Sequence, residues 1–339
     1  MTLESIARAS GVSLATVSLV LRDKPGINDQ TRKRVLDAAQ GLGYRRHPSP
    51  GNAPRVLRQV GVLVKARPGD QPHSNQFYSP VLAGVEAACR KQQINMLYAT
   101  VTVDEDNHPQ DLPRMLLEYD LDGVLLLGAF VDHTIEQLIQ RRGTPVALAD
   151  AYATSGAYDA AVSDNVGGAY QAVSYLIRQA HREIGMVGSL PDAFPSIEQR
   201  RRGYVQALAD NNIPERYFAD SHLAYDQVVD STLELLQRSP QVTALFCGND
   251  LTAVAAMQAA RALGRRLPED LSIIGFDNID LAEHLTPSLT TMHVDKAGLG
   301  RMAVQLLMNR AEFPDAACVT AMLRPTLIER QSVCAIAPT

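Results

Sequence analysis

The chain has 339 residues, of which 46% are hydrophobic and 20% charged, and its formal net charge is −5 at pH 7. This length predicts one small domain and one or two larger domains that have hydrophobic cores of their own. We find no signal peptide and no apolar run near the ~18 residues of a membrane span, so we expect a cytoplasmic protein without a membrane segment.

The first part of the chain predicts three short helices. Leu3 and Ile6 begin an apolar face at helical spacing, and Gly11 allows the left-handed backbone in which a helix ends. Ser13 and Asn28 are the predicted N-caps of the second and third helices. The apolar stripe of the third helix is formed by Val35, Leu36, Ala39 and Leu42. This is a helix-turn-helix pattern, in which the second helix enters the major groove of DNA.

The charge of this segment also favours DNA. Residues 1–58 contain ten Lys and Arg against four Asp and Glu, whereas the rest of the chain is acidic. A basic segment on an acidic body indicates a polyanion partner at one end of the chain only. The alternative is an ordinary three-helix lobe, because short helix pairs are common.

A linker follows the third helix. Pro48, Pro50 and Pro54, together with Gly51, exclude a long helix in this stretch. The flanking arginines either touch DNA phosphates or are merely solvated; they are Arg45, Arg46, Arg55 and Arg58.

From Val60 onward, apolar strand patterns alternate with helical patterns. We expect strands at 60–64, 95–99, 123–127, 145–149, 183–187, 244–247 and 272–276. We expect helices at 81–90, 112–118, 134–141, 169–179, 199–211, 227–237, 251–263 and 297–308. The alternation predicts parallel strands with crossover helices, in two successive α/β lobes. Two lobes that face each other would form a ligand cleft beyond the carboxyl ends of their strands.

Polar residues directly after predicted strands are the candidates for this cleft. Asp150, the pair Asn249-Asp250 and the pair Asp277-Asn278 each follow a strand, and Arg200 opens a helix. A single Asp at a strand end is more often a helix cap or a turn former than a ligand. Their repetition at equivalent strand ends of both lobes favours a polar binding cleft.

Signals of catalysis and of cofactors are missing from the sequence. There is no G-x-S-x-G elbow, no Walker loop, no H-E-x-x-H motif and no dinucleotide fingerprint. The four cysteines form no C-x-x-C motif and no metal-ligand pattern, which indicates buried thiols; they are Cys89, Cys247, Cys318 and Cys334. We therefore expect neither an enzyme nor a protein with a metal or a cofactor.

Several stretches carry a family resemblance. They are TLESIARASGVSLATVSLVL, KPGINDQTRKRVLDAAQGLGYR, QFYSPVLAGVEAAC, LDGVLLLG, RRRGYVQAL, LGRMAVQLL and the long stretch from ALFCGNDLTAVAAM to PSLTTMHVD. In this order the chain resembles, over almost its whole length, the lactose-repressor/galactose-repressor family. Members are dimeric transcription factors, often repressors, that bind operator DNA and a small effector. Their second domain is similar to periplasmic sugar-binding proteins.

The resemblance implies a domain organisation. Residues 1–47 would form an all-α helix-turn-helix domain that binds DNA, and residues 48–59 a Pro-rich hinge. Residues 60–339 would form a two-lobed α/β domain with parallel sheets that binds the effector and dimerises. Its first lobe would hold about 60–161 and 292–323, and its second about 162–291 and 324–339. The three connections between the lobes would lie near Ala161–Ser163, Thr290–His293 and Leu323–Ile328.

The resemblance also implies site residues. The effector, expected to be a polar small molecule such as a carbohydrate, would contact Phe77, Tyr78, Asp150, Ser196, Arg200, Tyr225, Asn249 and Asp277. The positions that contact operator DNA would be Ser13, Leu14, Ala15, Thr16, Ser18, Leu19, Arg22 and Asn28. Of these, Leu14, Ala15 and Leu19 would face bases, while Thr16 and Ser18 would lie near phosphates.

The chain departs from the family pattern in two places. Leu19 stands where many members have Arg, and a leucine cannot make the bidentate contact with guanine. Either the operator differs from the family's usual one or Arg22 takes over this contact. In the hinge, Leu57 either wedges into the minor groove or begins the first strand. No leucine heptad follows Arg330, so we expect a homodimer rather than a tetramer.

Two other classes of protein share parts of these patterns. A solute-binding transport protein would have the two-lobed body, but it would need an export signal and would lack the basic helix-turn-helix segment. An enzyme fused to a DNA-binding segment would need a catalytic set of residues. The sequence therefore favours a transcriptional regulator without a membrane partner.

Overall fold

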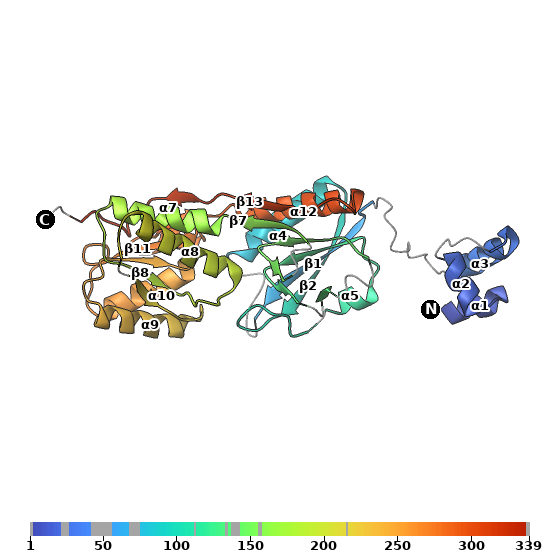
Figure 1. Ribbon diagram of the computed structural model, residues 1–339, viewed down its shortest axis with the longest axis horizontal. Helices are drawn as coiled ribbons and strands as arrows, with labels where there is room; N and C mark the ends of the chain where they lie inside the picture. The colour runs from blue at the N-terminus through green and yellow to red at the C-terminus, as the bar shows by residue number, and fades with distance from the viewer. Residues whose placement is uncertain are drawn as a thin grey trace. The chain divides into compact units, whose positions relative to one another are not determined.

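A computed structural model describes most of the chain (Figure 1). The described residues are 3–21, 27–41, 56–67, 75–111, 113–132, 135–136, 143–154, 158–214 and 216–336. The chain divides into two compact units, of which the first holds the helices α1 to α3 and the second holds every other described element. No helix in these ranges combines the length and the apolar character that a membrane span requires.

The first unit consists of α1 (Leu3–Ser10), α2 (Leu14–Leu21) and α3 (Asp29–Gly41). Both predicted N-caps are confirmed. The Ser13 Oγ accepts a hydrogen bond from the Thr16 amide at 3.1 Å, and the Asn28 Oδ1 accepts one from the Thr31 amide at 2.7 Å. Gly11, between α1 and α2, has a φ of +64°, which is the left-handed conformation that the turn was expected to need.

A small apolar core joins these three helices. Ile6, Val17 and Val35 are fully buried in it, and Val20 and Ala39 complete the cluster. The expectation that Leu36 shares this core is wrong, because its side chain is 37% exposed. Successive residues of a helix lie about 100° apart, so the helix that buries Val35 turns its neighbour toward solvent. Leu42 lies outside the described residues.

The first lobe of the second unit is built on a parallel sheet with the order β13-β7-β5-β3-β1-β2. Its strands are β1 (Gln59–Ala66), β2 (Asn95–Thr102), β3 (Gly123–Leu127), β5 (Val146–Ala149), β7 (Asp159–Ser163) and β13 (Thr320–Leu323). Its helices are α4 (Tyr78–Lys91), α5 (Arg114–Glu118) and α12 (Lys296–Glu312). A short pair, β4 (Phe130–Val131) and β6 (Tyr152–Ala153), lies beyond the main sheet.

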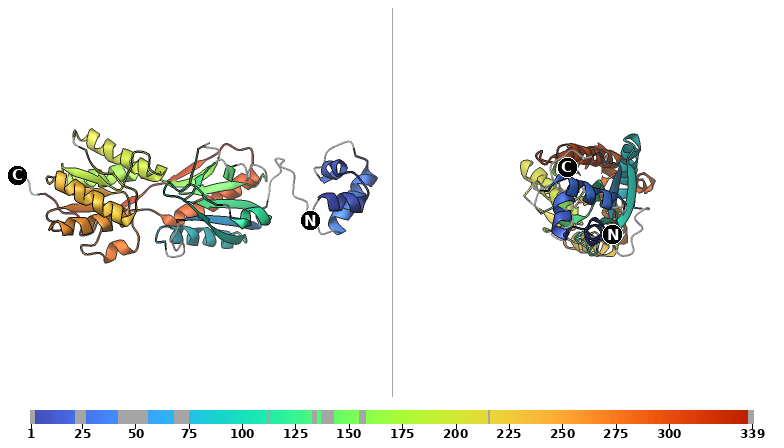
Figure 2. Two further views of the ribbon diagram at one scale, coloured as in Figure 1. Left: turned by 90° about the horizontal axis from the view of Figure 1, so that it is seen from below. Right: turned by 90° about the vertical axis from the view of Figure 1, so that its right-hand side faces the viewer.

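Two glycines allow α4 and α12 to pack closely side by side (Figures 1 and 2). A Cβ atom on Gly84 would lie 2.1 Å from the carbonyl oxygen of Ala297, and one on Gly300 would lie 2.1 Å from that of Val81. Any side chain at either position would therefore push the helices apart.

The second lobe is built on a sheet with the order β14-β12-β11-β10-β8-β9, in which only β14 is antiparallel to its neighbour. Its strands are β8 (Ile184–Val187), β9 (Tyr217–Ala219), β10 (Ala244–Cys247), β11 (Ser272–Asp277), β12 (Thr290–His293) and β14 (Thr326–Ile328). Its helices are α7 (Asn165–Arg178), α8 (Pro195–Asp210), α9 (Tyr225–Arg238), α10 (Asp250–Ala262) and α11 (Leu281–His284).

The chain changes lobe three times, directly after β7, β12 and β13. Two of the segments expected as connections, Ala161–Ser163 and Thr290–His293, are themselves strand residues, and the connections begin one residue later. The helix expected at 134–141 lies outside the described residues except for Ile135 and Glu136, which are helical.

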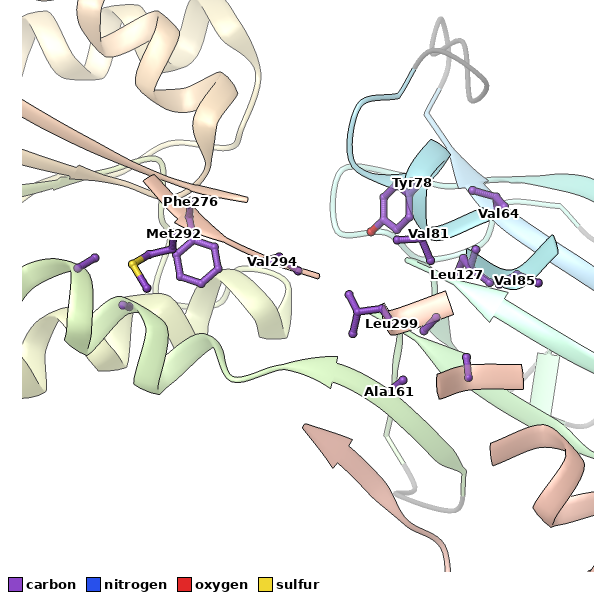
Figure 3. Close-up of a cluster of buried hydrophobic side chains, with 14 of the residues drawn as sticks. Val64, Tyr78, Val81, Val85, Leu127, Ala161, Phe276, Met292, Val294 and Leu299 are labelled. Atoms are coloured by element: carbon purple, nitrogen blue, oxygen red, sulfur yellow. The ribbon is translucent and has the colours of Figure 1, made fainter. Parts of the chain in front are cut away.

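One apolar core runs through both lobes. Figure 3 shows Leu127 and Leu299 of the first lobe together with Phe276 and Met292 of the second. Val294, on the connection from β12 to α12, belongs to the same cluster and is almost fully buried. This connection is therefore part of the packed interior.

Candidate functional site

The second helix of the first unit presents apolar side chains to solvent. On α2, Leu14 is 47% exposed and Leu19 is 41% exposed, while Val17 and Val20 face the core. Exposed apolar side chains on a helix in the major groove can contact the methyl groups of thymine. Thr16 is half-buried and its hydroxyl lies 2.9 Å from the Ser13 Oγ.

The other expected DNA contacts fall into two groups. Ser13 and Asn28 are exposed, and their side-chain oxygens serve as caps. Arg22 and the side chains of Ala15 and Ser18 lie outside the described residues.

Leu57 lies just before β1 and is only 8% exposed, within the core of the second unit. This burial favours the alternative in which Leu57 packs with the start of the first strand, although the strand itself begins at Gln59.

A cavity of about 470 Å³ opens between the two lobes of the second unit. It lies at the carboxyl ends of the strands, where β1, β5, β10 and β11 lead into the residues that line it. Seven of the eight expected effector contacts line this cavity, namely Phe77, Tyr78, Asp150, Ser196, Arg200, Asn249 and Asp277. That these residues bind an effector stays a prediction.

Tyr225 is the expected contact that the structure does not bring to the cavity. It is the first residue of α9, is 43% exposed, and its hydroxyl bonds with the side chain of Gln258 on α10. The preceding loop, His222 to Ala224, lines the cavity instead. The turn from the loop into the helix directs the side chain of Tyr225 away from the cavity.

Asp150 forms the polar centre of the first lobe's wall. Its Oδ2 accepts a hydrogen bond of 2.8 Å from the Tyr78 hydroxyl, whereas its buried Oδ1 accepts none from any described residue. Burial raises the pKa of Asp150, and the positive charge of Lys65 opposes this shift. The φ of +47° at Asp150 is a strained backbone conformation, of a kind that concentrates at functional sites.

Lys65 stands beside this carboxylate at the end of β1. Its Nζ donates to the Asn107 Oδ1 at 2.9 Å and lies 5.1 Å from the ring centres of both Tyr78 and Phe194. Sequence analysis missed Lys65, although it ends an apolar strand and the strand-end argument that selected Asp150 applies to it. It missed Phe194 because this residue comes from a loop without a pattern.

Arg200 forms the centre of the second lobe's wall. Its guanidinium is 4% exposed and is stacked 3.8 Å from the ring centre of Phe276. It donates to the Asn165 Oδ1 at 3.0 Å, the Gly248 carbonyl at 2.6 Å and the Asp277 Oδ1 at 3.0 Å. These bonds occupy three of its five N–H groups, and the other two make no hydrogen bond with any described residue.

Asp277 lies beside Arg200 in a crowded anionic environment. Burial raises the pKa of Asp277 to about 6, although the charge of Arg200 opposes the shift. Burial and the charge of Asp277 raise the pKa of Asp250 to about 7. The Lys296 ammonium donates to the Asp277 carbonyl at 2.6 Å and supplies a second positive charge next to this pair.

Asn249 has a structural role as well as a place in the cavity. Its Oδ1 caps α10 by accepting from the amide and the hydroxyl of Thr252, both at 2.8 Å. The capping alternative is therefore confirmed for Asn249, and its amide N–H groups remain available as donors. Within the described ranges, no group of His, Cys, Asp and Glu has an arrangement that would hold a metal ion.

Comparison with known proteins places both units. A family model described as bacterial regulatory proteins, lacI family, matches residues 2–47, and a periplasmic binding protein-like domain matches residues 173–333. The ribose operon repressor of Haemophilus influenzae is 33% identical over 342 residues, which cover 98% of each chain.

Two solved structures are similar over the same regions. The transcriptional regulator CelR in complex with cellobiose matches at 27% identity and a TM-score of 0.70, over 98% of this chain and 99% of that one. A LacI family transcriptional regulator from Enterococcus faecium with bound ribose matches at 26% identity and a TM-score of 0.70, over 83% of this chain and all of that one.

The repressor of Haemophilus influenzae is similar over nearly its whole length, and the helix-turn-helix segment and residues 173–333 of the two-lobed body each match a family model. The chain therefore belongs to the lacI family of bacterial regulatory proteins and is a sequence-specific, DNA-binding transcriptional regulator.

Proposed function

We propose that this regulator is a homodimeric repressor whose operator affinity is controlled by a neutral pentose of the ribose class, bound in the cavity between the lobes. The observation that carries this proposal is the buried Oδ1 of Asp150, a residue that lines the cavity, because no residue that the structure describes donates to this oxygen. A hydroxyl of a bound sugar supplies the missing donor.

The charge of the cavity favours a neutral ligand. Its lining contains five carboxylates against three Lys and Arg, namely Glu105, Asp106, Asp150, Asp250 and Asp277 against Lys65, Arg67 and Arg200. A phosphate ester in this cavity would add negative charge next to buried carboxylates, which costs free energy. Hydroxyl groups instead donate to the carboxylates and accept from the free N–H groups of Arg200.

The size of the cavity and the ligands named for related proteins favour a monosaccharide. A volume of about 470 Å³ lies in the lower half of the usual range for small-molecule sites. Phe77 and Phe194 line the same space and offer apolar faces to the C–H side of a sugar ring. One relative is named as a repressor of a ribose operon, and one similar structure holds ribose.

Control of DNA binding follows from the position of the cavity between two lobes. A ligand held by Asp150 in one lobe and by Arg200 and Asp277 in the other favours the closed arrangement, by as much as its affinity for closed exceeds that for open. In a dimer, closure changes the spacing of the two DNA-binding units, and half-sites on the operator require a set spacing. Coupling of about 1–3 kcal/mol is ordinary for such a link.

The proposal is tested by calorimetric titration of the full chain with D-ribose and with D-ribose 5-phosphate. We expect D-ribose to bind at least about 30-fold more tightly, because the phosphate adds charge to an anionic cavity. Operator titrations with and without D-ribose then show whether the sugar releases or promotes DNA binding. Tighter binding of the phosphate ester, or no binding of D-ribose at millimolar concentration, would contradict the proposal.

Sugar binding should weaken in mild acid. The carboxylate of Asp277 is the form that accepts hydroxyl protons, and its pKa is raised to about 6 in the free protein. The affinity for D-ribose is therefore highest well above this pKa and decreases as the pH falls through it. We expect D-ribose to bind about tenfold more weakly at pH 5 than at pH 7.5. Calorimetry across this range measures the effect, and circular dichroism verifies that the chain stays folded. An affinity that is constant or rises toward pH 5 would exclude Asp277 as an ionised acceptor.

A further inference from the structure

We propose that Tyr152 and Asn165 form a relay that positions Arg200 and couples the effector cavity to the first lobe. The relay consists of the hydrogen bonds from Tyr152 to Asn165 and from Asn165 to Arg200. Tyr152 belongs to β6 in the first lobe, while Asn165 and Arg200 belong to α7 and α8 in the second. In its effector-dependent part, the inference rests on the proposed function.

Asn165 is the centre of the relay. It is the first residue of α7, directly after the connection between the lobes, and is 1% exposed. Its Oδ1 accepts from the Arg200 Nε at 3.0 Å. Its Nδ2 lies within hydrogen-bond distance of three acceptors, namely the Gln199 Oε1 at 3.2 Å, the Ser163 carbonyl at 3.2 Å and the Tyr152 hydroxyl at 3.4 Å.

These distances make Asn165 responsive to movement. The amide has two N–H groups for three acceptors, so a small shift toward one acceptor weakens the bond to another. The bond to Tyr152 is the longest of the three. The Ser163 carbonyl also belongs to the first lobe, but it lies only two residues before Asn165 along the chain, whereas Tyr152 reaches Asn165 from the separate strand β6. It is therefore the bond that changes first when the lobes move.

Tyr152 contacts the second lobe through its ring as well as through its hydroxyl. The ring meets Phe194 edge to face, with centroids 5.2 Å apart and an interplanar angle of 86°. Phe194 lines the effector cavity, whereas Tyr152 does not. Tyr152 thus senses the cavity wall through Phe194 and Asn165 without contacting a ligand.

The structure leaves room for a second arrangement. A cavity of about 390 Å³ lies behind the relay, lined by Tyr152, Asn165 and Gln199 and by residues of the connection and of β13. The Ser163 Oγ, at the end of β7, is buried and has no hydrogen-bond partner among the described residues. Ser163 does not line this cavity, but its carbonyl bonds with Asn165, so its unpartnered hydroxyl lies in the residue next to the relay and offers a bond when the lobes shift.

The test compares Tyr152→Phe with Tyr175→Phe in the full chain. The first removes the hydroxyl of the relay and keeps the ring on Phe194. The second removes a hydroxyl that bonds with the Glu329 Oε2 at 3.1 Å within the second lobe, and serves as the matched control. At saturating D-ribose, we expect Tyr152→Phe to reduce about fivefold the factor by which the sugar changes operator affinity, in whichever direction the wild type responds; fivefold corresponds to a typical hydrogen bond. The control should stay within twofold.

A second readout does not depend on the sugar. Hydrogen–deuterium exchange of the ligand-free protein should be about fivefold faster in residues 159–166 and 195–202 of Tyr152→Phe, and unchanged in the control. Equal exchange in the two variants, or a changed D-ribose affinity with an unchanged ratio at saturation, would overturn the relay. If the wild type does not respond to D-ribose, the proposed function fails, and the exchange data alone decide on the relay.

Discussion

A chain that begins at Val56 should lose specific operator binding by a factor of at least about 1000, the lower end of the ratio between specific and non-specific affinity. The removed residues form the helices α1 to α3. They also carry most of the net positive charge of residues 1–58. Starting at Val56 keeps Leu57, which is buried in the core of the second unit. The shortened chain therefore keeps the packing of its effector-binding part.

Fluorescence anisotropy with a duplex selected from random DNA by the full chain measures this loss. The full chain should show a logarithmic salt dependence with a slope of about −0.9 for each phosphate neutralised. The thermal unfolding of the shortened chain, followed by circular dichroism, controls for its fold. If the shortened chain bound the same duplex with the same salt dependence, DNA recognition would have to lie in the two-lobed body.

The elements of the fold that have strong local patterns could be predicted from the sequence. Strand β3 was placed to the residue because GVLLL is a continuous apolar run, and the caps at Ser13 and Asn28 have the residue types that capping requires. Strands β9 and β14 were missed because each has only three residues and lies at an edge of its sheet. Strand β12, TTMH, was expected only as a connection because it lacks an apolar run, although the sheet buries it.

The residues of the candidate site that directly follow strands could be predicted from the sequence. Asp150 and Asp277 follow buried strands, and parallel strands bring such positions to one edge. The pair Lys65–Asn107 joins β1 to the loop after β2, and the pair Tyr152–Asn165 joins β6 to α7. The first pair depends on the conformation of a loop within the first lobe, and the second depends on how the two lobes meet. No local pattern of residues encodes either.

Replacing Arg200 by Ala should abolish the response to D-ribose while operator binding without sugar stays near that of the wild type. Arg200 lines the cavity, two of its N–H groups make no bond with any described residue, and its bond to Asp277 holds that carboxylate in place. Two charge-assisted hydrogen bonds contribute about 3–6 kcal/mol together, so we expect sugar affinity to fall at least about 100-fold. Calorimetry gives the affinity, and operator titration gives the response.

Arg201→Ala is the matched control, because Arg201 is the next residue of the same helix and makes bonds of the same kinds. Its guanidinium donates to the Ser189 carbonyl at 3.0 Å, pairs with Asp220 and stacks 3.7 Å from the ring centre of Phe218, but it does not line the cavity. Loss of the response only in Arg200→Ala would place the effector against this guanidinium, since both variants lose a stacked, ion-paired arginine from α8. If both variants kept the wild-type affinity for D-ribose, Arg200 would be a structural partner of Asp277 and Asn165, and the sugar would bind elsewhere in the cavity.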